Sequence, residues 1–512
     1  MNICLIKPPI LHKGASFALM PSPPLGLAYI AGALKRYNHD LSVIDCSAAG
    51  ISDVEYHSNG VYLFGLNIKN TVNRIPVNVD IVCISSMFTN NWLYERELIK
   101  AVKEKFSEAI VIVGGEHANA APELCFTQSP IDYIVFGEGE ETIVDLMQTI
   151  EAKGDFSKVL GIVFKKDGKL VFNKKRRRIS AIENIARPAW ELFPLDDYFK
   201  HEMSYGLFRG NTLPVMATRG CPYTCTFCSN PQMWGKKYEM RPAQDFVDEL
   251  EYLYKTYNVV NFELYDLTAV IFKKWIVEMC QEILDRGLDI TYQLPSGTRS
   301  EAIDYEVASL LYKSGCKNIT YAPESGSERV LRDIKKRVKI DKMLQSISYS
   351  SKVGMNIKLN MIIGFPDDTH RDIWATIWFL IKCSWYGAND TAPAIFSPYP
   401  GSALFDRLQE EKKLNIYDDE YIYEIINSYD LWPGKIYCNN ISSFMLKIYS
   451  FVILITFYAS NFLFRPQRFF FTIRNLITQK HESRLEQILH KNFFKNFFGL
   501  TLFSKVKKHE TF

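Results

Sequence analysis

The chain has no large excess of charge of either sign, no low-complexity tract and no internal repeat. Its 512 residues include 60 Lys and Arg against 57 Asp and Glu, which leaves a formal net charge of only +3. A charge this small provides no general attraction to nucleic acid, and no nucleic-acid partner is expected. A hydrophobic content of 47% is ordinary for globular proteins, and the length allows roughly two to four domains with buried cores.

Most of the cysteines are not grouped, and no secretory signal precedes the first apolar run. Eight of the eleven cysteines occur singly, mostly within apolar stretches, at positions 4, 46, 83, 125, 280, 316, 383 and 438. Such residues are typically small buried hydrophobes of a protein in a reducing compartment. A cytoplasmic location is therefore expected.

The remaining three cysteines, Cys221, Cys225 and Cys228, lie in one short segment, GCPYTCTFCSN. Three thiolates at this spacing can hold three irons of a cubane cluster and leave the fourth iron open to a small molecule. A structural zinc site would require a fourth ligand nearby, but the nearest histidines in the sequence are His201 and His370. An odd number of closely spaced cysteines also argues against disulfides. The open cluster is favoured over zinc or incidental cysteines.

This Cys-x3-Cys-x2-Cys spacing, with Phe227 directly before the last cysteine, resembles the radical S-adenosylmethionine (SAM) enzymes. The resemblance implies a [4Fe–4S] cluster whose open iron is chelated by the amino and carboxylate groups of SAM. One electron, from a reductant such as flavodoxin or ferredoxin, would then cleave SAM to a 5′-deoxyadenosyl radical. The cofactor performs the difficult chemistry, and the protein orients it and excludes water.

The first 150 residues alternate short apolar strands with helical stretches. Strands are expected at residues 3–6, 41–44, 81–85, 109–113 and 133–136, with helices at 27–37 and 92–106. This alternation predicts a parallel, doubly wound sheet. Ligands bind such sheets at the carboxyl ends of the strands, where glycine allows close approach of the backbone.

The glycine motifs after these strands occur in a specific order: PPLGL, then VGGEH, then FGEGE. That order resembles the cobalamin-binding domain found before many radical SAM cores. The resemblance implies that the corrinoid is lined by Ser85, Ser86, Gly114, Gly115, Glu116, Gly137 and Glu138. The alternative is that Gly114 and Gly137 only permit tight turns. The Asp-x-His-x-x-Gly motif of other cobalamin proteins is absent, and His117 lacks its spacing, so no histidine on cobalt is expected.

A connector is expected between the two main domains. Residues 161–172 alternate around Asp167-Gly168 and predict a hairpin. The basic run at residues 174–178 follows it and is interpreted as the solvated end of that hairpin, because no aromatic platform for nucleic acid accompanies it. Residues 188–198 are predicted to form an ordered, Pro- and aromatic-containing linker.

From about residue 212 the chain again alternates strand and helix. Strands are expected at 213–217, 259–264, 290–294, 318–322, 356–363 and 392–396, with helices such as 244–257 and 272–286 between them. Six such units predict a partial (β/α)6 TIM barrel with its site at the carboxyl ends of the strands.

Four motifs after these strands match places where the radical SAM family binds its cofactor. By resemblance, Asp266 is preferred over Glu263 for the SAM amino group, with a helix cap as the alternative. Arg299 is a candidate partner for the SAM carboxylate. Glu324, in PESGS, resembles the acid that holds the ribose hydroxyls, and a helix cap is again the alternative. Gly364, in GFPDDT, resembles the turn that packs near the adenine.

The last hundred residues are helical by pattern, and they are basic and rich in Phe. Residues 449–464 carry no charge, but the run is short for a membrane span and is interpreted as a buried helix. Residues 465–512 hold ten Lys and Arg against three Asp and Glu, with Phe469–Phe471, Phe493, Phe494, Phe497 and Phe498 among them. Such composition also suits peripheral contact with the inner face of a membrane.

The sequence therefore predicts an α/β protein of four parts. These are a Rossmann-like cobalamin-binding domain (1–155), a hairpin and linker (156–205), a radical SAM core (206–410) and a helical region (411–512). The chain resembles the cobalamin-dependent radical SAM enzymes, in the branch of the magnesium-protoporphyrin ester cyclases and hopanoid methylases. That resemblance implies methylation of an unactivated carbon of a small, apolar or lipid-like substrate, through methylcobalamin and a 5′-deoxyadenosyl radical. The alternatives are radical oxidation, cyclisation or ring rearrangement without methyl transfer, and a non-catalytic iron–sulfur redox protein.

Overall fold

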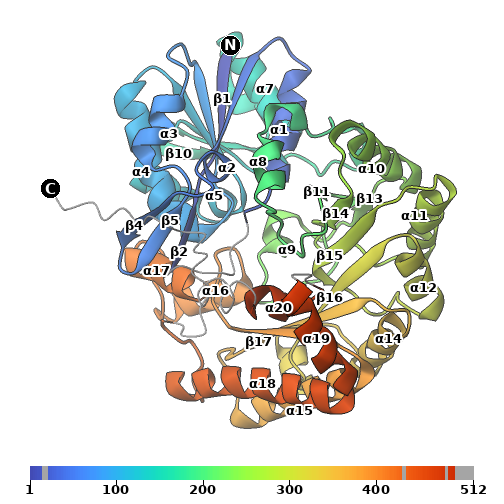
Figure 1. The fold of residues 1–512 in the computed structure, drawn as a ribbon. Coiled ribbons are helices and arrows are strands. Elements are labelled where there is room, and N and C mark those ends of the chain that lie inside the picture. The colour runs from blue at the N-terminus through green and yellow to red at the C-terminus, as the bar shows by residue number, and fades with distance from the viewer. Residues whose placement is uncertain (14–20, 429–433, 479–481, 490–512) are drawn as a thin grey trace.

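The fold consists of two sheets, each flanked by helices, which lie against one another (Figure 1). The computed structural model describes residues 1–13, 21–428, 434–478 and 482–489. The first sheet lies at the upper left of Figure 1, the second lies to the right and below, and the long helix near the C-terminus, labelled α18, lies along the base.

The first sheet has seven strands in the order β10-β9-β8-β7-β6-β1-β3. Five of these strands are parallel, as the sequence predicted. They are β1 (Asn2–Lys7), β3 (Asp40–Asp45), β6 (Ile81–Ser85), β7 (Ile110–Gly114) and β8 (Tyr133–Val135).

Both faces of this sheet are buried. Ile3 and Leu5 of β1 pack with one hydrophobic cluster, whereas Cys4 and Ile6 pack with another, because alternate side chains of a strand point to opposite faces. The first face is covered by α1 (Leu25–Lys35) and α7 (Gly139–Glu151). The second is covered by α3 (Ile68–Arg74), α4 (Trp92–Lys105) and α6 (Pro122–Gln128).

The hairpin that was expected in the connector extends this sheet instead. Strand β9 (Ile162–Lys166) pairs antiparallel with β8, and β10 (Lys169–Phe172) pairs with β9. The backbone N–H and C=O groups at the edge of β8 are thereby hydrogen-bonded. A detached hairpin would have left these groups unpaired. The sequence patterns also missed a small antiparallel sheet of β2 (Ile10–Lys13), β4 (Val54–Ser58) and β5 (Val61–Phe64).

The second sheet is the predicted partial barrel. Its six strands are parallel and lie in sequence order. They are β11 (Thr212–Val215), β14 (Asn261–Leu264), β15 (Thr291–Thr298), β16 (Cys316–Glu324), β17 (Asn356–Ile363) and β18 (Asp390–Ile395). The connecting helices are α10 (Ala243–Tyr257), α11 (Lys273–Asp285), α12 (Tyr305–Lys313), α13 (Glu328–Asp333), α14 (Ile340–Lys352) and α15 (His370–Tyr386).

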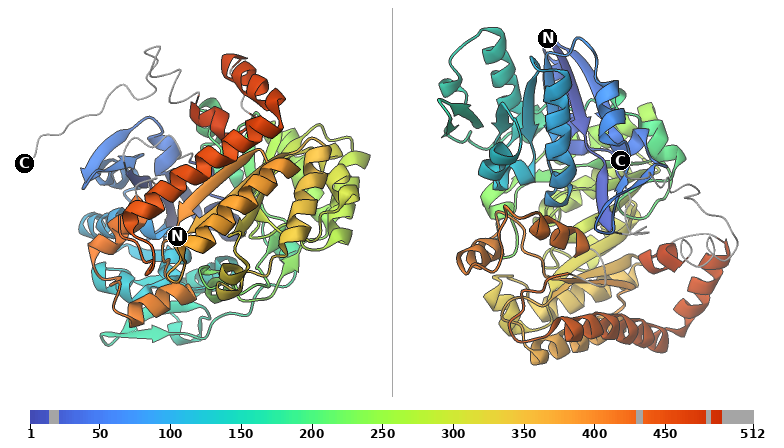
Figure 2. Two further views of the ribbon diagram at one scale, coloured as in Figure 1. Left: turned by 90° about the horizontal axis from the view of Figure 1, so that it is seen from below. Right: turned by 90° about the vertical axis from the view of Figure 1, so that its left-hand side faces the viewer.

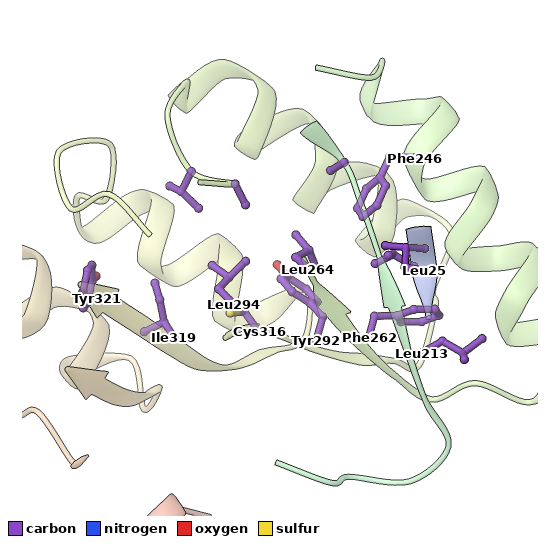
Figure 3. Close-up of a cluster of buried hydrophobic side chains, with 14 of the residues drawn as sticks. Leu25, Leu213, Phe246, Phe262, Leu264, Tyr292, Leu294, Cys316, Ile319 and Tyr321 are labelled. Atoms are coloured by element: carbon purple, nitrogen blue, oxygen red, sulfur yellow. The ribbon is translucent and has the colours of Figure 1, made fainter. Parts of the chain in front are cut away.

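The hydrophobic core of the barrel is continuous with that of the first domain. Figure 3 shows Leu25, from the start of α1, among the barrel side chains Leu213, Phe246 and Phe262. The alternate residues Asn261 and Glu263 of β14 are buried and polar. Polar side chains at this alternate register belong to the other face of the sheet, which is where a partial barrel holds its site.

The C-terminal region begins with two helices that reach back to the first domain. They are α16 (Ala403–Glu410) and α17 (Asp419–Asn427), and α17 contacts β2 and α4. Arg96 of α4 donates to Asp419 over 2.6 Å. The first domain is therefore held by both the start and the end of the barrel.

Three further helices complete the described chain. They are α18 (Ser443–Phe464), α19 (Pro466–Thr478) and α20 (Arg484–Leu489). Helix α18 is long and apolar enough to cross a membrane by length and composition, and 33% of its most apolar window is buried in the fold. The expectation of a buried helix thus holds for one face of α18 only. Phe493, Phe494, Phe497 and Phe498 lie outside the described residues.

Candidate functional site

The three grouped cysteines lie on a loop that follows the short strand β12 (Thr218–Arg219). All three are free, half-buried thiols. The loop is held from two sides through the backbone of Thr226. Its N–H donates to Ile334 O over 3.0 Å, and its carbonyl oxygen accepts from Leu404 N over 2.9 Å. These two backbone hydrogen bonds of the protein thus fix the position of the loop.

Gly220 at the start of this loop cannot be replaced without moving the backbone. Its φ is +86°, and a Cβ there would lie 2.1 Å from the carbonyl oxygen of Lys237. Strand β13 (Glu239–Met240) pairs with β12 directly beside it. The close approach of these two segments determines where the cysteine loop leaves the barrel.

The chemistry of the three thiols fits a cluster with three cysteine ligands. Burial raises the pKa of Cys228 to about 12, and it raises the pKa of Cys225 against the opposing charge of Lys336. Binding iron therefore requires loss of the thiol protons, which the charge of the metal drives. Within the described residues, no three Cys, His, Asp or Glu side chains converge on a single metal ion. A cubane spreads its ligands over separate irons, so this spacing suits a cluster better than zinc.

Phe227 and Gly364 lie together beside the loop. The ring of Phe227 lies 5.7 Å from that of Phe365, the residue after Gly364, and the ammonium of Lys336 lies 5.9 Å from the Phe227 centroid. Gly364 has a φ of +80°, which lets β17 turn sharply toward the cysteine loop. The two predicted positions are therefore brought together.

Glu324 is the last residue of β16 and has a φ of +67°, a strained conformation for a residue with a side chain. Lys336 Nζ donates to its carboxylate over 2.8 Å, and the side chains of Glu324 and Lys336 are 8% and 13% exposed. Burial opposes the charge of Lys336, but Glu324 outweighs it and the pKa of Lys336 is raised. The helix-cap alternative is wrong, because Ser327 caps α13.

Arg299 follows β15 and is already paired. Its guanidinium donates to Glu301 over 2.7 and 3.1 Å and to the carbonyl of Arg337. It also lies over the ring of Tyr223, within the cysteine loop, at 4.0 Å from the centroid. Arg299 is thus adjacent to the loop, and a ligand carboxylate would compete with Glu301 for it.

Asp266 supports the strand that leads into the cysteine loop. It is buried, and its carboxylate accepts from the backbone N–H of Ala217, at 3.2 Å, and from both the N–H and the hydroxyl of Thr218. Burial raises the pKa of Asp266 to about 6, against those hydrogen bonds. It caps no helix, since α11 begins at Lys273.

Glu263, the other candidate for the SAM amino group, is committed elsewhere. It accepts from the backbone N–H of Gly206 over 2.6 Å and from that of Tyr205 over 3.2 Å. Both acids therefore already have hydrogen-bond partners. Only Asp266 is bonded to the strand that leads into the cysteine loop.

The first-domain residues that were predicted to line cobalamin meet at the ends of β6, β7 and β8. Ser86 directly follows Ser85, the end of β6, and its backbone N–H donates to Gly114 O over 2.7 Å. A Cβ on Gly115, where φ is +129°, would lie 2.3 Å from Ser86 O. Gly137 N–H donates to Asn119 Oδ1 over 2.6 Å. These loops form one surface with half-buried glycine backbone, which suits close approach of a large flat ligand.

His117 is not presented to this surface. It is buried, Nδ1 lies 3.1 Å from Thr89 Oγ1, and its ring centroid lies 5.1 Å from that of Trp92. Burial lowers the pKa of His117 to about 3, so it is neutral. This position agrees with the expectation that no histidine ligates cobalt, which stays a prediction.

The two loop systems face each other across one cleft. The hydroxyl of Ser229, directly after Cys228, donates to the carboxylate of Glu116. The adjoining cleft is open to solvent, has an empty volume of about 300 Å³ and is lined by Glu116, Asn119, Ala120, Phe136, Ser229, Gln232 and Met233. Sequence motifs missed Asn119, Gln232 and Met233, because none belongs to a strand-end signature, whereas Phe136 begins the FGEGE motif.

Glu138 and the basic run form a contact between the domains. Glu138 lies 3.3 Å from Arg219 and 3.4 Å from Arg178, and Arg219 also binds Glu140. Lys175 donates to the carbonyls of Gln232 and Met233 over 3.1 and 3.0 Å. The interpretation of residues 174–178 as a solvated hairpin end therefore holds for Lys174 and Arg177, which are exposed, but not for Lys175 and Arg178. Glu138 faces the barrel rather than the glycine surface.

Comparison with known families agrees with this arrangement. The family model described as "B12 binding domain" matches residues 18–147. The model described as "Radical SAM superfamily" matches residues 215–380, which include all three cysteines of the loop. The chain is a cobalamin-dependent radical SAM enzyme. Its cofactors are cobalamin, SAM and a [4Fe–4S] cluster.

The relatives of this enzyme include methyltransferases and cyclases. It is 29% identical to an uncharacterised methyltransferase of Pyrococcus horikoshii over 79% of this chain and 83% of that one. It is 25% identical to the anaerobic magnesium-protoporphyrin IX monomethyl ester cyclase of Cereibacter sphaeroides, over 87% and 71% of the two chains. The hopanoid C-3 methylase of Methylococcus capsulatus is 24% identical over 72% and 65%. The predicted branch is confirmed, because B12-binding and radical SAM domains occur together here and the relatives include both cyclases and methylases.

The fold is also that of a solved member of the group. The methyltransferase TsrM of Kitasatospora setae, determined with cobalamin and a [4Fe–4S] cluster bound, superposes with a TM-score of 0.64 at 16% identity. The match covers 80% of this chain and 78% of TsrM. The predicted order of Rossmann-like domain, partial barrel and helical C-terminus is confirmed.

Proposed function

We propose that this enzyme transfers a methyl group to an unactivated carbon of a small, apolar or lipid-like substrate. When bound, the cluster with SAM supplies a 5′-deoxyadenosyl radical, and cobalamin supplies the methyl group. The observation that carries the proposal is the contact of Ser229 with Glu116, because it joins the cysteine loop to the glycine surface over a single cleft. A substrate in that cleft would be next to both cofactors.

The chain's own residues would bind and orient. Cys221, Cys225 and Cys228 are the proposed cluster ligands. Glu324, held by Lys336, is the proposed partner of the SAM ribose, and Arg299 that of the SAM carboxylate. Because Lys336 already holds the Glu324 carboxylate, this side chain loses little conformational entropy when SAM binds. This favours a preformed SAM site.

The remaining predicted positions divide into lining and support. Phe227 and Gly364 would form the wall beside the adenine, and Ser85, Ser86, Gly114, Gly115, Glu116 and Gly137 would line the corrinoid. Asp266 is instead proposed to position the cysteine loop through Ala217 and Thr218. Glu138 is proposed to hold the two domains together through Arg219.

The proposed partners are a small-molecule substrate and a one-electron reductant such as flavodoxin or ferredoxin. The proposed location is the cytoplasm, at the inner face of its membrane.

The reaction is tested by the ratio of the two products formed from SAM. Anaerobically reconstituted enzyme would be incubated with SAM, a reductant and an extract of cellular small molecules and lipids. Methyl transfer predicts S-adenosylhomocysteine and 5′-deoxyadenosine in equal amounts, both rising on addition of the extract.

Radical oxidation or cyclisation is the second candidate, and the likeness to the magnesium-protoporphyrin ester cyclases supports it. It differs in consuming no methyl group. A rise in 5′-deoxyadenosine without S-adenosylhomocysteine would therefore favour cyclisation and contradict methyl transfer.

A further inference from the structure

The base of the barrel exposes three tryptophans on one helix. Trp374, Trp378 and Trp385 of α15 are 56%, 61% and 63% exposed. Their spacing of four and seven residues places them along one stripe of the helix. Trp is a costly residue to leave in water in such numbers, because each side chain carries a large apolar area.

Helix α18 carries a second apolar stripe. Phe444, Ile455 and Leu463 are 70%, 67% and 76% exposed, whereas Leu446, Ile453 and Phe457 on the opposite side are buried in the core. The buried stripe explains why α18 packs on the barrel. Nothing in that packing explains the exposed one.

The two helices run side by side in the same direction. His370 Nδ1 lies 2.8 Å from Tyr449 Oη near their starts, and the ring of Trp385 lies 5.0 Å from that of Phe464 near their ends. Seen from below, α15 and α18 lie next to each other across the base (Figure 2, left). The exposed tryptophans therefore adjoin α18, and the two stripes belong to a common apolar surface.

Helix α19 extends this surface and has no buried residue of its own. Phe470 and Ile477 are 69% exposed and Ile473 is 41% exposed, at helical spacing. The ring of Phe469 lies 5.6 Å from that of Phe462 at the end of α18. An amphipathic helix without a core contact gains stability only where its apolar side meets an apolar phase. We call the exposed sides of α15, α18 and α19 the base face.

The charge of the base face is positive. Residues 443–478 contain no Asp or Glu, but they contain Lys447, Arg465, Arg468 and Arg474. The single acid of α15, Asp372, is buried and bound by Arg329.

Two of these arginines form no ion pair with an acid in the described part of the chain. Arg465 donates to Ser351 Oγ, and Arg468 donates to the carbonyls of Gly387 and Ala388. Burial, together with the nearby charge of Arg465, lowers the pKa of Arg468 to about 10. This uncompensated positive charge beside an apolar surface suits phosphate headgroups.

We propose that the base face docks on the surface of a membrane that contains anionic lipid. Aromatic and aliphatic side chains would enter the interface, and the arginines and lysines would meet the headgroups. The contact is peripheral, because α18 cannot leave the fold. Asn461 is bonded to Ala388 O and Tyr458 to Asp390, and removal of α18 would uncover β18.

Binding to vesicles tests this proposal without turnover, so its result is independent of the proposed reaction. The full chain would be sedimented with vesicles of phosphatidylcholine alone and with added phosphatidylglycerol. We expect binding to the anionic vesicles, weakened by high salt and reversed by alkaline carbonate. Ile455→Glu and Phe470→Glu should each weaken binding about tenfold, since each removes an inserted apolar side chain.

Matched variants elsewhere make the result specific. Val77, on the first domain, is 91% exposed, and Val77→Glu should bind vesicles as the parent does. Arg474→Glu should weaken binding to anionic vesicles only. Absence of vesicle binding, or binding unchanged in Ile455→Glu and Phe470→Glu, would overturn the proposal. So would a dimer in solution that dissociates on the same substitutions, because the face would then belong to a second copy.

Discussion

The hydroxyl of Ser229 donates to the carboxylate of Glu116, and this contact joins the loop of the cluster cysteines to the glycine surface of the first domain. Burial raises the pKa of Glu116, and the bond from Ser229 opposes that rise. The pair therefore lies where the two cofactor sites meet. Its loss should change how the sites work together more than it changes either site alone.

Ser229→Ala should uncouple the two half-reactions. Methyl transfer should fall about tenfold, because small displacements of reacting groups are costly, while 5′-deoxyadenosine formation persists. The ratio of S-adenosylhomocysteine to 5′-deoxyadenosine measures this. Ser157→Ala, on the surface of the first domain, is the control and should keep the parent ratio. An unchanged ratio in Ser229→Ala would show that the contact is incidental.

Cys225→Ala should abolish SAM cleavage and leave cobalamin bound. Removing one of three ligands empties the cluster site, but the glycine surface of the first domain is untouched. Iron, cobalamin and 5′-deoxyadenosine are measured on the same sample. Cys280→Ala provides the control, since Cys280 is also a free thiol but belongs to helix α11 and not to the loop. Retained SAM cleavage in Cys225→Ala would refute the cluster assignment.

Arg219→Met should destabilise the joint between the domains. Arg219 is 4% exposed and binds Glu138 and Glu140, so its removal leaves the buried Glu140 without its partner and Glu138 with Arg178 alone. Loss of one member of a buried pair costs about 3 kcal/mol. Calorimetry should then show separate unfolding of the two domains. Arg177→Met, at an exposed position of the basic run, should behave as the parent, and equal behaviour of the two variants would contradict this role.

Glu324→Gln should weaken SAM binding at least about tenfold, because a charge-assisted hydrogen bond is lost and Lys336 is left buried beside a neutral group. Equilibrium binding of SAM to the reconstituted enzyme measures it. Glu328→Gln, on the exposed side of α13, is the matched control. Equal affinity in the two variants would remove Glu324 from the SAM site.

Asp372→Asn should lower stability in a pH-dependent way. Burial opposes the charge of Asp372, but Arg329, Ser327 and Thr369 outweigh it and hold its pKa well below its usual range. The ionised form therefore stabilises the start of α15, by about 2 kcal/mol. That stability is present above the usual Asp pKa and is lost as the pH falls through the lower pKa of the folded state.

Denaturant titrations at several pH values check this prediction. The difference between the parent and Asp372→Asn should be full at pH 7 and shrink below about pH 4. Asp341→Asn, at an exposed position of α14, should show no such difference. A difference independent of pH would mean that the charge of Asp372 is not what stabilises α15.

Much of the fold could be predicted because each strand carries its own local signal. The apolar runs of β1, β6 and β7 and the glycines after them are readable one residue at a time. The edge position of β9 and β10 was not readable, because pairing with β8 is a long-range choice that a hairpin pattern leaves open. The small sheet of β2, β4 and β5 was missed for the same reason.

Within the site, the positions of the motif residues could be predicted from the sequence, but the side chains that hydrogen-bond to them could not. Glu324 and the cysteines belong to local patterns, whereas Lys336 becomes a partner of Glu324 only through the turn after α13. The basic run was read only in part, because its charge suggested solvent around every member. Its partners Glu138, Gln232 and Met233 lie on two other elements that the fold brings to it. The roles assigned to the cofactor-lining residues stay predictions.

The most direct test of the central claim is the cofactor content of the anaerobically purified and reconstituted chain. We expect near-stoichiometric cobalamin together with a cluster that supports SAM cleavage, and loss of the cluster alone in Cys225→Ala. A chain that takes up a cluster and cleaves SAM but holds no cobalamin would contradict the account, because the glycine surface opposite Ser229 would then serve another ligand.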